Sequence, residues 1–118
     1  MRESFRDLRV WQEAIRMSLS LYRLTSLFPS DERWGLTSQT RRAGVSTALN
    51  IAEGYGRASR GEYLQFLGIA RGSLCEVETL LVIARDLGYG NEKALSEAEL
   101  ICTSTSKLLN ALIRALRP

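Results

Sequence analysis

The amino-acid sequence predicts an all-α protein, an antiparallel four-helix bundle. Apolar residues recur at three- and four-residue steps along four long segments, and no segment alternates as a half-buried strand does. The connections between the segments are short, which places sequential helices side by side in opposite directions, so the expected topology is up-down-up-down. With 118 residues, 45% of them hydrophobic, the chain is long enough to form one domain, residues 1–118, with its own core.

The first helix is expected over about residues 7–28, with Asp7 as its N-cap and Pro29 just beyond its end. One set of apolar residues has helical spacing and is expected to be its buried face: Leu8, Trp11, Ile15, Leu19 and Tyr22. A second helix, about residues 32–53, follows acidic residues that suit the positive end of a helix. Its middle is crowded with small residues such as Gly44, which favours close packing of another helix there over a ligand groove.

The third helix is expected over about residues 60–87, between a capping box formed by Ser59 and Glu62 and a C-cap at Gly88. Its apolar residues fill two adjacent stripes, and so wide a surface exceeds what one neighbouring helix covers. The helix therefore either lies centrally in its own bundle or is shared with another subunit. The first stripe holds Tyr63, Leu67, Ala70, Leu74, Val77, Leu81 and Ala84, and the second holds Phe66, Ile69, Leu80, Ile83 and Leu87.

The fourth helix is expected over about residues 92–116, with Asn91 or Ser96 as its N-cap. Its expected buried side is marked by Leu100, Ile101, Leu108, Leu112, Ile113 and Leu116. No internal repeat or low-complexity linker interrupts this order, so the four helices account for nearly the whole chain.

The sequence contains no histidine, which removes the commonest general base and the commonest metal ligand. We therefore expect no enzymatic activity and no metal, cofactor or small-molecule substrate. Gly54 and Gly56 do not begin a dinucleotide-binding fingerprint, because their segment leaves a helix and not a strand. Cys75 and Cys102 lack metal-ligand spacing and are expected to be reduced thiols. The charged N-terminus and the lack of a long apolar run predict a cytoplasmic protein that has no signal peptide and does not enter a membrane.

Polar residues at spacings of three or four share one face of the second helix: Gln39, Arg42, Ser46, Asn50 and Glu53. We interpret this face as a buried hydrogen-bond network that fixes helix register and reaches Ser73 and Glu76. A substrate site is the alternative. Because an unpaired buried Arg42 is costly, the network requires a carboxylate partner, and Arg42→Leu is expected to destabilise the fold.

The net charge is +3, and every basic residue except Lys93 and Lys107 is an arginine. This bias suits phosphate binding, although a GC-rich coding sequence explains it equally well. Between residues 33 and 71, six arginines occur with only two glutamates. The turn before the third helix carries two of them beside a positive helix N-terminus, which favours either a phosphate-binding corner or a solvated basic turn. The candidate phosphate contacts are Arg41, Arg57, Arg60 and Arg71.

Longer motifs match a known family: Phe5-x-Asp7-Leu8-x-Val10-Trp11-Gln12, Phe28-Pro29-x-x-Glu32-x-x-Gly35-Leu36-Thr37-Ser38-Gln39, Arg41-Arg42-Ala43-x-Val45-Ser46, Asn50-Ile51-Ala52-Glu53-Gly54-x-Gly56-Arg57 and Phe66-Leu67-x-Ile69-Ala70-x-Gly72-Ser73-Leu74-x-Glu76. With them the chain resembles the bacterial four-helix-bundle proteins of the 23S rRNA intervening-sequence family, to which the accessory protein of diversity-generating retroelements is related. The resemblance implies a homopentameric ring of antiparallel bundles without known catalytic activity. The accessory relative binds nucleic acid and a reverse transcriptase through a basic surface.

We therefore expect a non-enzymatic homo-oligomer, a pentamer by the resemblance, that binds RNA or DNA weakly through surface arginines. The alternative is an interaction adaptor whose rim docks a partner protein, such as a nucleic-acid enzyme. A hydrolase that works without histidine is the third and least favoured alternative.

Overall fold

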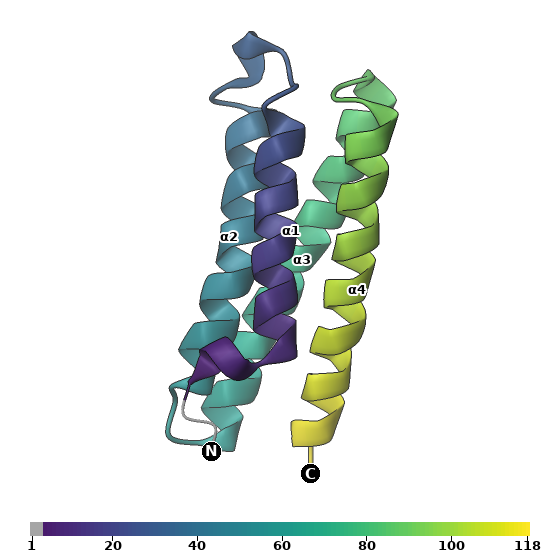
Figure 1. Cartoon of the computed structure of the whole chain (residues 1–118). Helices are drawn as coiled ribbons and strands as arrows, with labels where there is room; N and C mark the ends of the chain where they lie inside the picture. Colours follow the sequence, from purple (N-terminus) through teal and green to yellow (C-terminus); the bar gives the residue numbers. More distant parts are fainter. Residues whose placement is uncertain (1–3) are drawn as a thin grey trace.

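The computed structural model describes residues 4–118, and every regular element in that range is helical (Figure 1). The elements are the long helices α1 (Arg9–Thr25), α2 (Leu36–Tyr55), α3 (Arg60–Leu87) and α4 (Glu92–Leu116), with the short 3₁₀ turns η1 (Phe5–Asp7) and η2 (Ser30–Glu32). The predicted all-α fold with four helices is thereby confirmed. Residues 1–3 of the expected domain lie outside the described residues.

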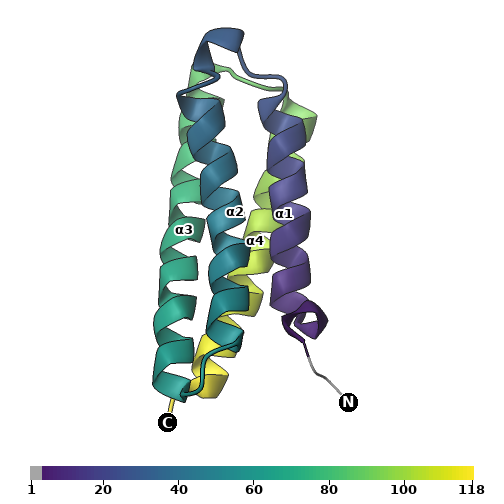
Figure 2. The ribbon, with the colours of Figure 1, turned by 90° about the vertical axis from the view of Figure 1, so that its left-hand side faces the viewer.

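The four helices lie lengthwise beside one another in a body of 44 × 23 × 23 Å (Figures 1 and 2). The α1–α2 and α3–α4 connections lie at one end of this body, and the α2–α3 turn lies at the other. α3 packs chiefly on α2, while α1 contacts both α2 and α4. The α1–α2 connection contains η2 and is the longest of the three, so it carries the residues with most freedom to face solvent.

The ends of α3 and α4 agree with the expected ones because their signals are local. The Ser59 hydroxyl accepts a hydrogen bond from the Glu62 amide at 3.1 Å, and the Asn91 side chain accepts one from the Ala94 amide at 2.8 Å. Gly88 ends α3 with a φ of 76°, a left-handed conformation that favours glycine. Asn91, and not Ser96, is therefore the N-cap of α4.

The starts of α1 and α2 differ from the expected ones. Asp7 lies inside η1, and Leu8 occupies the N-cap of α1 without a side-chain hydrogen bond. α2 begins at Leu36, four residues later than predicted, because the preceding residues form η2. A carboxylate oxygen of Glu32 nevertheless accepts the Leu36 amide hydrogen bond at 2.9 Å, so the acidic residue caps the helix from the preceding turn.

The expected buried face of α1 is wrong in part, because Leu8, Trp11 and Ile15 are only partly buried against the core. The side chains in the core are on the neighbouring stripe, Val10, Ala14, Met17, Leu21 and Leu24, whereas Leu19 is 52% exposed and Tyr22 is 44% exposed. α1 carries apolar residues on two sides, and helical spacing alone does not say which side meets the bundle. The bundle buries the stripe that contains Leu21, which packs closely against Gly44 of α2.

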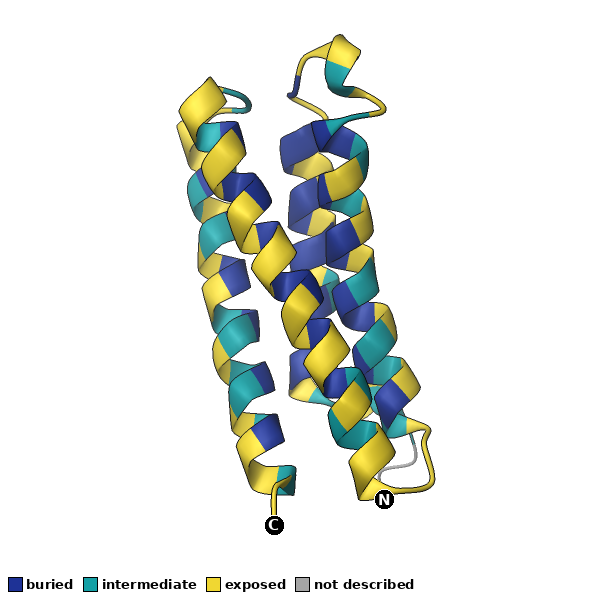
Figure 3. Ribbon diagram, turned by 180° about the vertical axis from the view of Figure 1, so that it is seen from behind, coloured by how far each residue is buried: buried dark blue, intermediate teal, exposed yellow. Residues whose placement is uncertain are grey.

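The small residues of α2 permit the predicted close helix contacts. A Cβ at Gly44 would lie 2.7 Å from a methyl group of Leu21 on α1, and one at Gly54 would lie 2.9 Å from Cβ of Phe66 on α3. In α3, the first predicted stripe supplies buried residues from Leu67 to Ala84. Much of the second stripe is exposed, as is Leu100 of α4, which was expected to be buried; the exposed side of α3 faces the viewer in Figure 3.

Candidate functional site

The four predicted phosphate contacts do not come together. Arg41 lies in the first half of α2 beside α1, Arg57 lies in the turn after α2, and Arg60 and Arg71 lie in α3, which Arg60 begins. The Arg71 guanidinium donates a hydrogen bond to the Asn110 side chain of α4 at 3.3 Å. Any site built from these arginines within one chain therefore uses one or two of them at a time.

Arg41 is held in place by α1. Its Nε donates a hydrogen bond to the Thr25 hydroxyl at 2.8 Å, and an Nη donates one to the Tyr22 carbonyl at 3.4 Å. The guanidinium also lies 4.4 Å from the centre of the Tyr22 ring. These contacts fix the position of a half-buried positive charge between α1 and α2.

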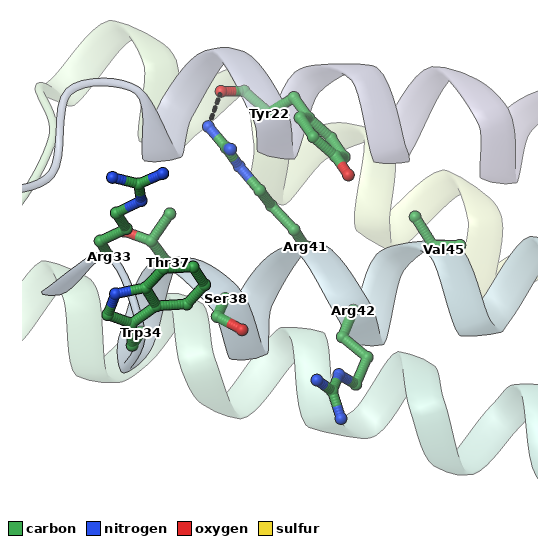
Figure 4. A pocket seen from close by; sticks show the side chains of 8 residues that line it. All are labelled: Tyr22, Arg33, Trp34, Thr37, Ser38, Arg41, Arg42 and Val45. Atoms are coloured by element: carbon green, nitrogen blue, oxygen red, sulfur yellow. Dashed lines mark hydrogen bonds between the residues drawn. The ribbon is translucent and has the colours of Figure 1, made fainter.

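A pocket of about 480 Å³ surrounds Arg41 (Figure 4). We call it the arginine pocket; its residues are Tyr22, Arg33, Trp34, Thr37, Ser38, Arg41, Arg42 and Val45. Three of them are arginines and none is acidic. Arg33 and Arg41 reach toward α1, whereas Arg42 extends in the opposite direction over α3, so positive charge lies on both sides of the hollow. Such an arrangement attracts anions, and arginine forks suit phosphate oxygens.

Trp34 is the most exposed aromatic side chain in the described part of the protein, at 81%. The Arg33 guanidinium lies 4.9 Å from its ring centre. The segment that carries it is fixed on both sides: the Gly35 amide bonds to the Glu32 carbonyl at 3.0 Å, and a Glu32 carboxylate oxygen accepts from the Tyr89 hydroxyl at 3.1 Å. The hydrogen bond to that carboxylate raises the pKa of Tyr89 above its usual value.

The basic corner between α2 and α3 is less available than the sequence suggests. Arg57 forms an ion pair with Glu53 one turn earlier, and its guanidinium lies 4.7 Å from the Phe66 ring centre. Arg60 is exposed and makes no hydrogen bond or ion pair with the residues that the structure describes. A phosphate at this corner would therefore meet one free arginine and one that is already paired.

The expected polar network is smaller than predicted. The Ser46 and Ser73 hydroxyls share a hydrogen bond of 2.8 Å between α2 and α3, and the Asn50 amide donates to the Ser46 carbonyl at 2.9 Å. The longer polar residues of the predicted set reach solvent and are exposed: Gln39, Arg42, Glu53 and Glu76. Because Arg42 is not buried, it needs no buried carboxylate.

The sequence reasoning missed Arg33 and Trp34. They were assigned to the start of a helix, where a tryptophan is unremarkable, but they lie in the connection between η2 and α2. A large aromatic residue next to arginine, between a helix-ending proline and a glycine, was the available signal for an exposed site.

A second hollow, the α1–α2 groove, adjoins the arginine pocket and shares Tyr22 and Val45 with it. It measures about 340 Å³ and is almost wholly apolar; its other large side chains are Phe5, Trp11, Ile15, Leu19 and Leu49. Most of the residues predicted to form the buried face of α1 therefore line an open groove.

Two further findings concern residues 4–118. That range contains no group of three acidic or cysteine side chains able to hold a metal ion, and no helix in it is long and apolar enough to cross a membrane. Cys75 and Cys102 are both free thiols.

Comparisons with known proteins agree with the fold. A crystal structure of a protein of unknown function from the S23 ribosomal protein family of Bacteroides thetaiotaomicron is similar with a TM-score of 0.81 and 22% sequence identity, covering 89% of this chain and 95% of that one. No curated protein matches the chain. The family model described as 23S rRNA-intervening sequence protein matches residues 6–111. The chain therefore belongs to the family of 23S rRNA-intervening sequence proteins.

Proposed function

We propose that this protein is a cytoplasmic, non-enzymatic, up-down-up-down bundle that assembles as a homopentamer and binds RNA or DNA weakly through surface arginines. The observation that carries the nucleic-acid part is the arginine pocket, which three arginines and no acidic residue line. Phosphates are the anions that such a surface meets in greatest density on a nucleic acid. Arg60 supplies a further free charge at the other end of α2.

Assembly is supported by two apolar surfaces that the single chain leaves uncovered. One is the α1–α2 groove, and the other is the outer stripe of α3 with Ile69, Ile83 and Leu87, which are 47%, 41% and 54% exposed. Two different surfaces on one chain are what a closed ring of head-to-tail contacts requires. The number five comes from the family resemblance.

Assembly also makes weak binding useful. One chain offers only a few phosphate contacts, and each contact is sensitive to salt. A ring repeats the arginine pocket and the Arg60 corner in every subunit, so a long nucleic acid engages several of them at once.

The test is a fluorescence-anisotropy titration of mixed-sequence RNA and DNA at low and near-physiological salt. We expect binding at low salt. The logarithm of the association constant should fall linearly with the logarithm of the salt concentration, with a slope of several units. The slope should decrease in Arg33→Ala/Arg42→Ala and less in Arg57→Ala/Arg60→Ala, because Arg57 is already paired. Arg114→Ala, an exposed charge on α4, is the matched control. An absence of binding at low salt would refute the proposal.

The second candidate function is an interaction adaptor, which the α1–α2 groove favours. A groove of this size and polarity suits the apolar face of a partner helix. An adaptor would lose its partner in co-purification when Leu19 or Leu49 is replaced by glutamate, while arginine variants would leave the complex intact.

A further inference from the structure

Trp34 has an unusual environment beside the arginine pocket. A tryptophan that is 81% exposed contributes little to stability by burial. Hydrogen bonds from the Gly35 and Leu36 amides to Glu32 nevertheless fix the turn that carries it. The indole lines the same pocket as Arg41 and Arg42, and the Arg33 guanidinium lies 4.9 Å from its ring centre. An open aromatic face next to phosphate-binding side chains is the arrangement that stacks a nucleic-acid base.

We infer that the arginine pocket binds a single-stranded segment of RNA or DNA, with one unpaired base stacked on Trp34. The inference rests on the proposed nucleic-acid binding and adds to it a site and a strand preference. In a duplex both faces of an internal base are covered by neighbouring base pairs, so a side chain on a rigid surface stacks only on an unpaired base.

The arginines flank the stacking position. Arg33 and Arg41 lie on the α1 side of the pocket, and Arg42 extends over α3 (Figure 4). A strand that passes over Trp34 therefore meets positive charge before and after the stacked base. Arg41 is already positioned by Thr25 and Tyr22, so binding a phosphate there costs little ordering of its side chain.

Titrations of nucleic acids distinguish the contribution of charge to the affinity from that of stacking. Labelled oligo(U) and oligo(dT) and a duplex of equal length are titrated with the whole protein at one salt concentration and then over a salt series. We expect both single strands to bind more tightly than the duplex. Trp34→Leu should weaken single-strand binding by at least about fivefold and leave duplex binding and the salt slope unchanged, because no charge is lost.

The control variants keep one property each. Trp34→Phe retains an aromatic ring and should retain most of the affinity, whereas Arg33→Ala keeps the indole and should lower the salt slope. Because Trp34 is exposed, these variants are expected to fold, and circular dichroism and light scattering check the fold and the oligomer mass.

The outcomes distinguish the two proposals. Unchanged single-strand binding in Trp34→Leu, with binding otherwise intact, overturns the stacking site and leaves the proposed function standing. A loss of oligomer mass in Trp34→Leu assigns the indole to a subunit contact and also overturns it. A protein that binds none of the three probes at low salt overturns both. Equal loss for oligo(U) and oligo(dT) supports a site that reads bases and phosphates without regard to the sugar.

Discussion

Two adjacent arginines of α2 have opposite environments. Arg41 points to α1 and is half-buried against Tyr22, whereas Arg42 extends over α3 into solvent. Successive residues on a helix are turned away from each other, so neighbours in sequence need not share a face. The sequence-based assignment of Arg42 to a buried network and Arg41 to a surface contact had these environments reversed.

Substitution of the two residues by leucine should therefore have unequal effects. Arg42→Leu is expected to change the free energy of unfolding by less than about 0.5 kcal/mol, since the side chain is exposed and makes no hydrogen bond or ion pair with residues 4–118. Arg41→Leu should destabilise by about 1 kcal/mol, because the Thr25 hydrogen bond and the Tyr22 ring contact are lost. Urea denaturation of both variants measures this, and a larger loss in Arg42→Leu would contradict the assignment.

The two thiols should differ strongly in reactivity. Burial raises the pKa of the Cys102 thiol to about 12, so almost no thiolate exists there at pH 8, and the side chain is also inaccessible. Cys75 is exposed on α3. Under native conditions a thiol reagent such as DTNB should modify Cys75 quickly and Cys102 slowly, and both quickly in denaturant. Equal reaction rates of the two thiols in the native protein would show that α4 opens readily at Cys102. A Cys75→Ser variant that reacts as quickly as the wild-type protein would show the same.

The candidate site was predictable only in part at this scale. The excess of arginine between residues 33 and 71 pointed to α2, and Arg41 does line the pocket. The pairing of Arg57 with Glu53 has helical spacing and was available from the sequence. The exposure of Trp34 had only a general signal, its place between Pro29 and Gly35, because its extent depends on how η2 turns away from the bundle.

At the scale of helices, capping residues predicted helix ends correctly, whereas the spacing of apolar residues did not predict which face of α1 packs in the core. The ends of α3 and the start of α4 followed from the capping residues Ser59, Gly88 and Asn91, which act within a few residues of themselves. The buried face of α1 depends on which stripe α2 approaches, and that is decided by small residues on the other helix. Whether a segment forms a helix thus depends on that segment alone. Which face the helix buries depends also on the helix that packs against it.

Two glycines inside helices test how closely α2 and α3 approach each other. Gly54→Ala should destabilise the fold, because its Cβ would lie 2.9 Å from Cβ of Phe66 and 3.2 Å from the Tyr63 carbonyl, neither of which moves freely. Gly68→Ala, on the exposed side of α3 with no atom within 4 Å, should stabilise by about 0.5–1 kcal/mol through helix propensity. Thermal unfolding of both variants compares them directly. Stabilisation by both would mean that α2 and α3 are farther apart than described.

At the scale of the whole molecule, the four helices cover one core and leave two apolar surfaces open. The α1–α2 groove runs directly into the arginine pocket through Tyr22 and Val45. A neighbouring subunit seated in the groove would therefore end beside the pocket and could narrow it. If the chain assembles through this groove, assembly and nucleic-acid binding would be coupled, and each proposal predicts an effect on the other.

Leu49→Glu tests the assembly separately from the fold. Leu49 is 63% exposed in the single chain, so the charge costs little there, but in a subunit contact it would bury a carboxylate and lose the roughly 1.5–3 kcal/mol that a buried leucine contributes. The same penalty recurs at every contact of a ring. Light scattering coupled to size exclusion should show a fall in mass toward the monomer, with helical circular dichroism preserved.

The control for that experiment is Gln65→Glu, which adds the same charge to an exposed polar position of α3 and should leave the mass unchanged. If Leu49→Glu keeps the mass of the wild-type protein, the α1–α2 groove is not the subunit contact, and the adaptor function gains the groove as its docking surface. If both the mass and the nucleic-acid affinity fall in Leu49→Glu while Gln65→Glu keeps both, the added charge alone does not explain the loss, and repetition of weak arginine contacts around the ring accounts for it.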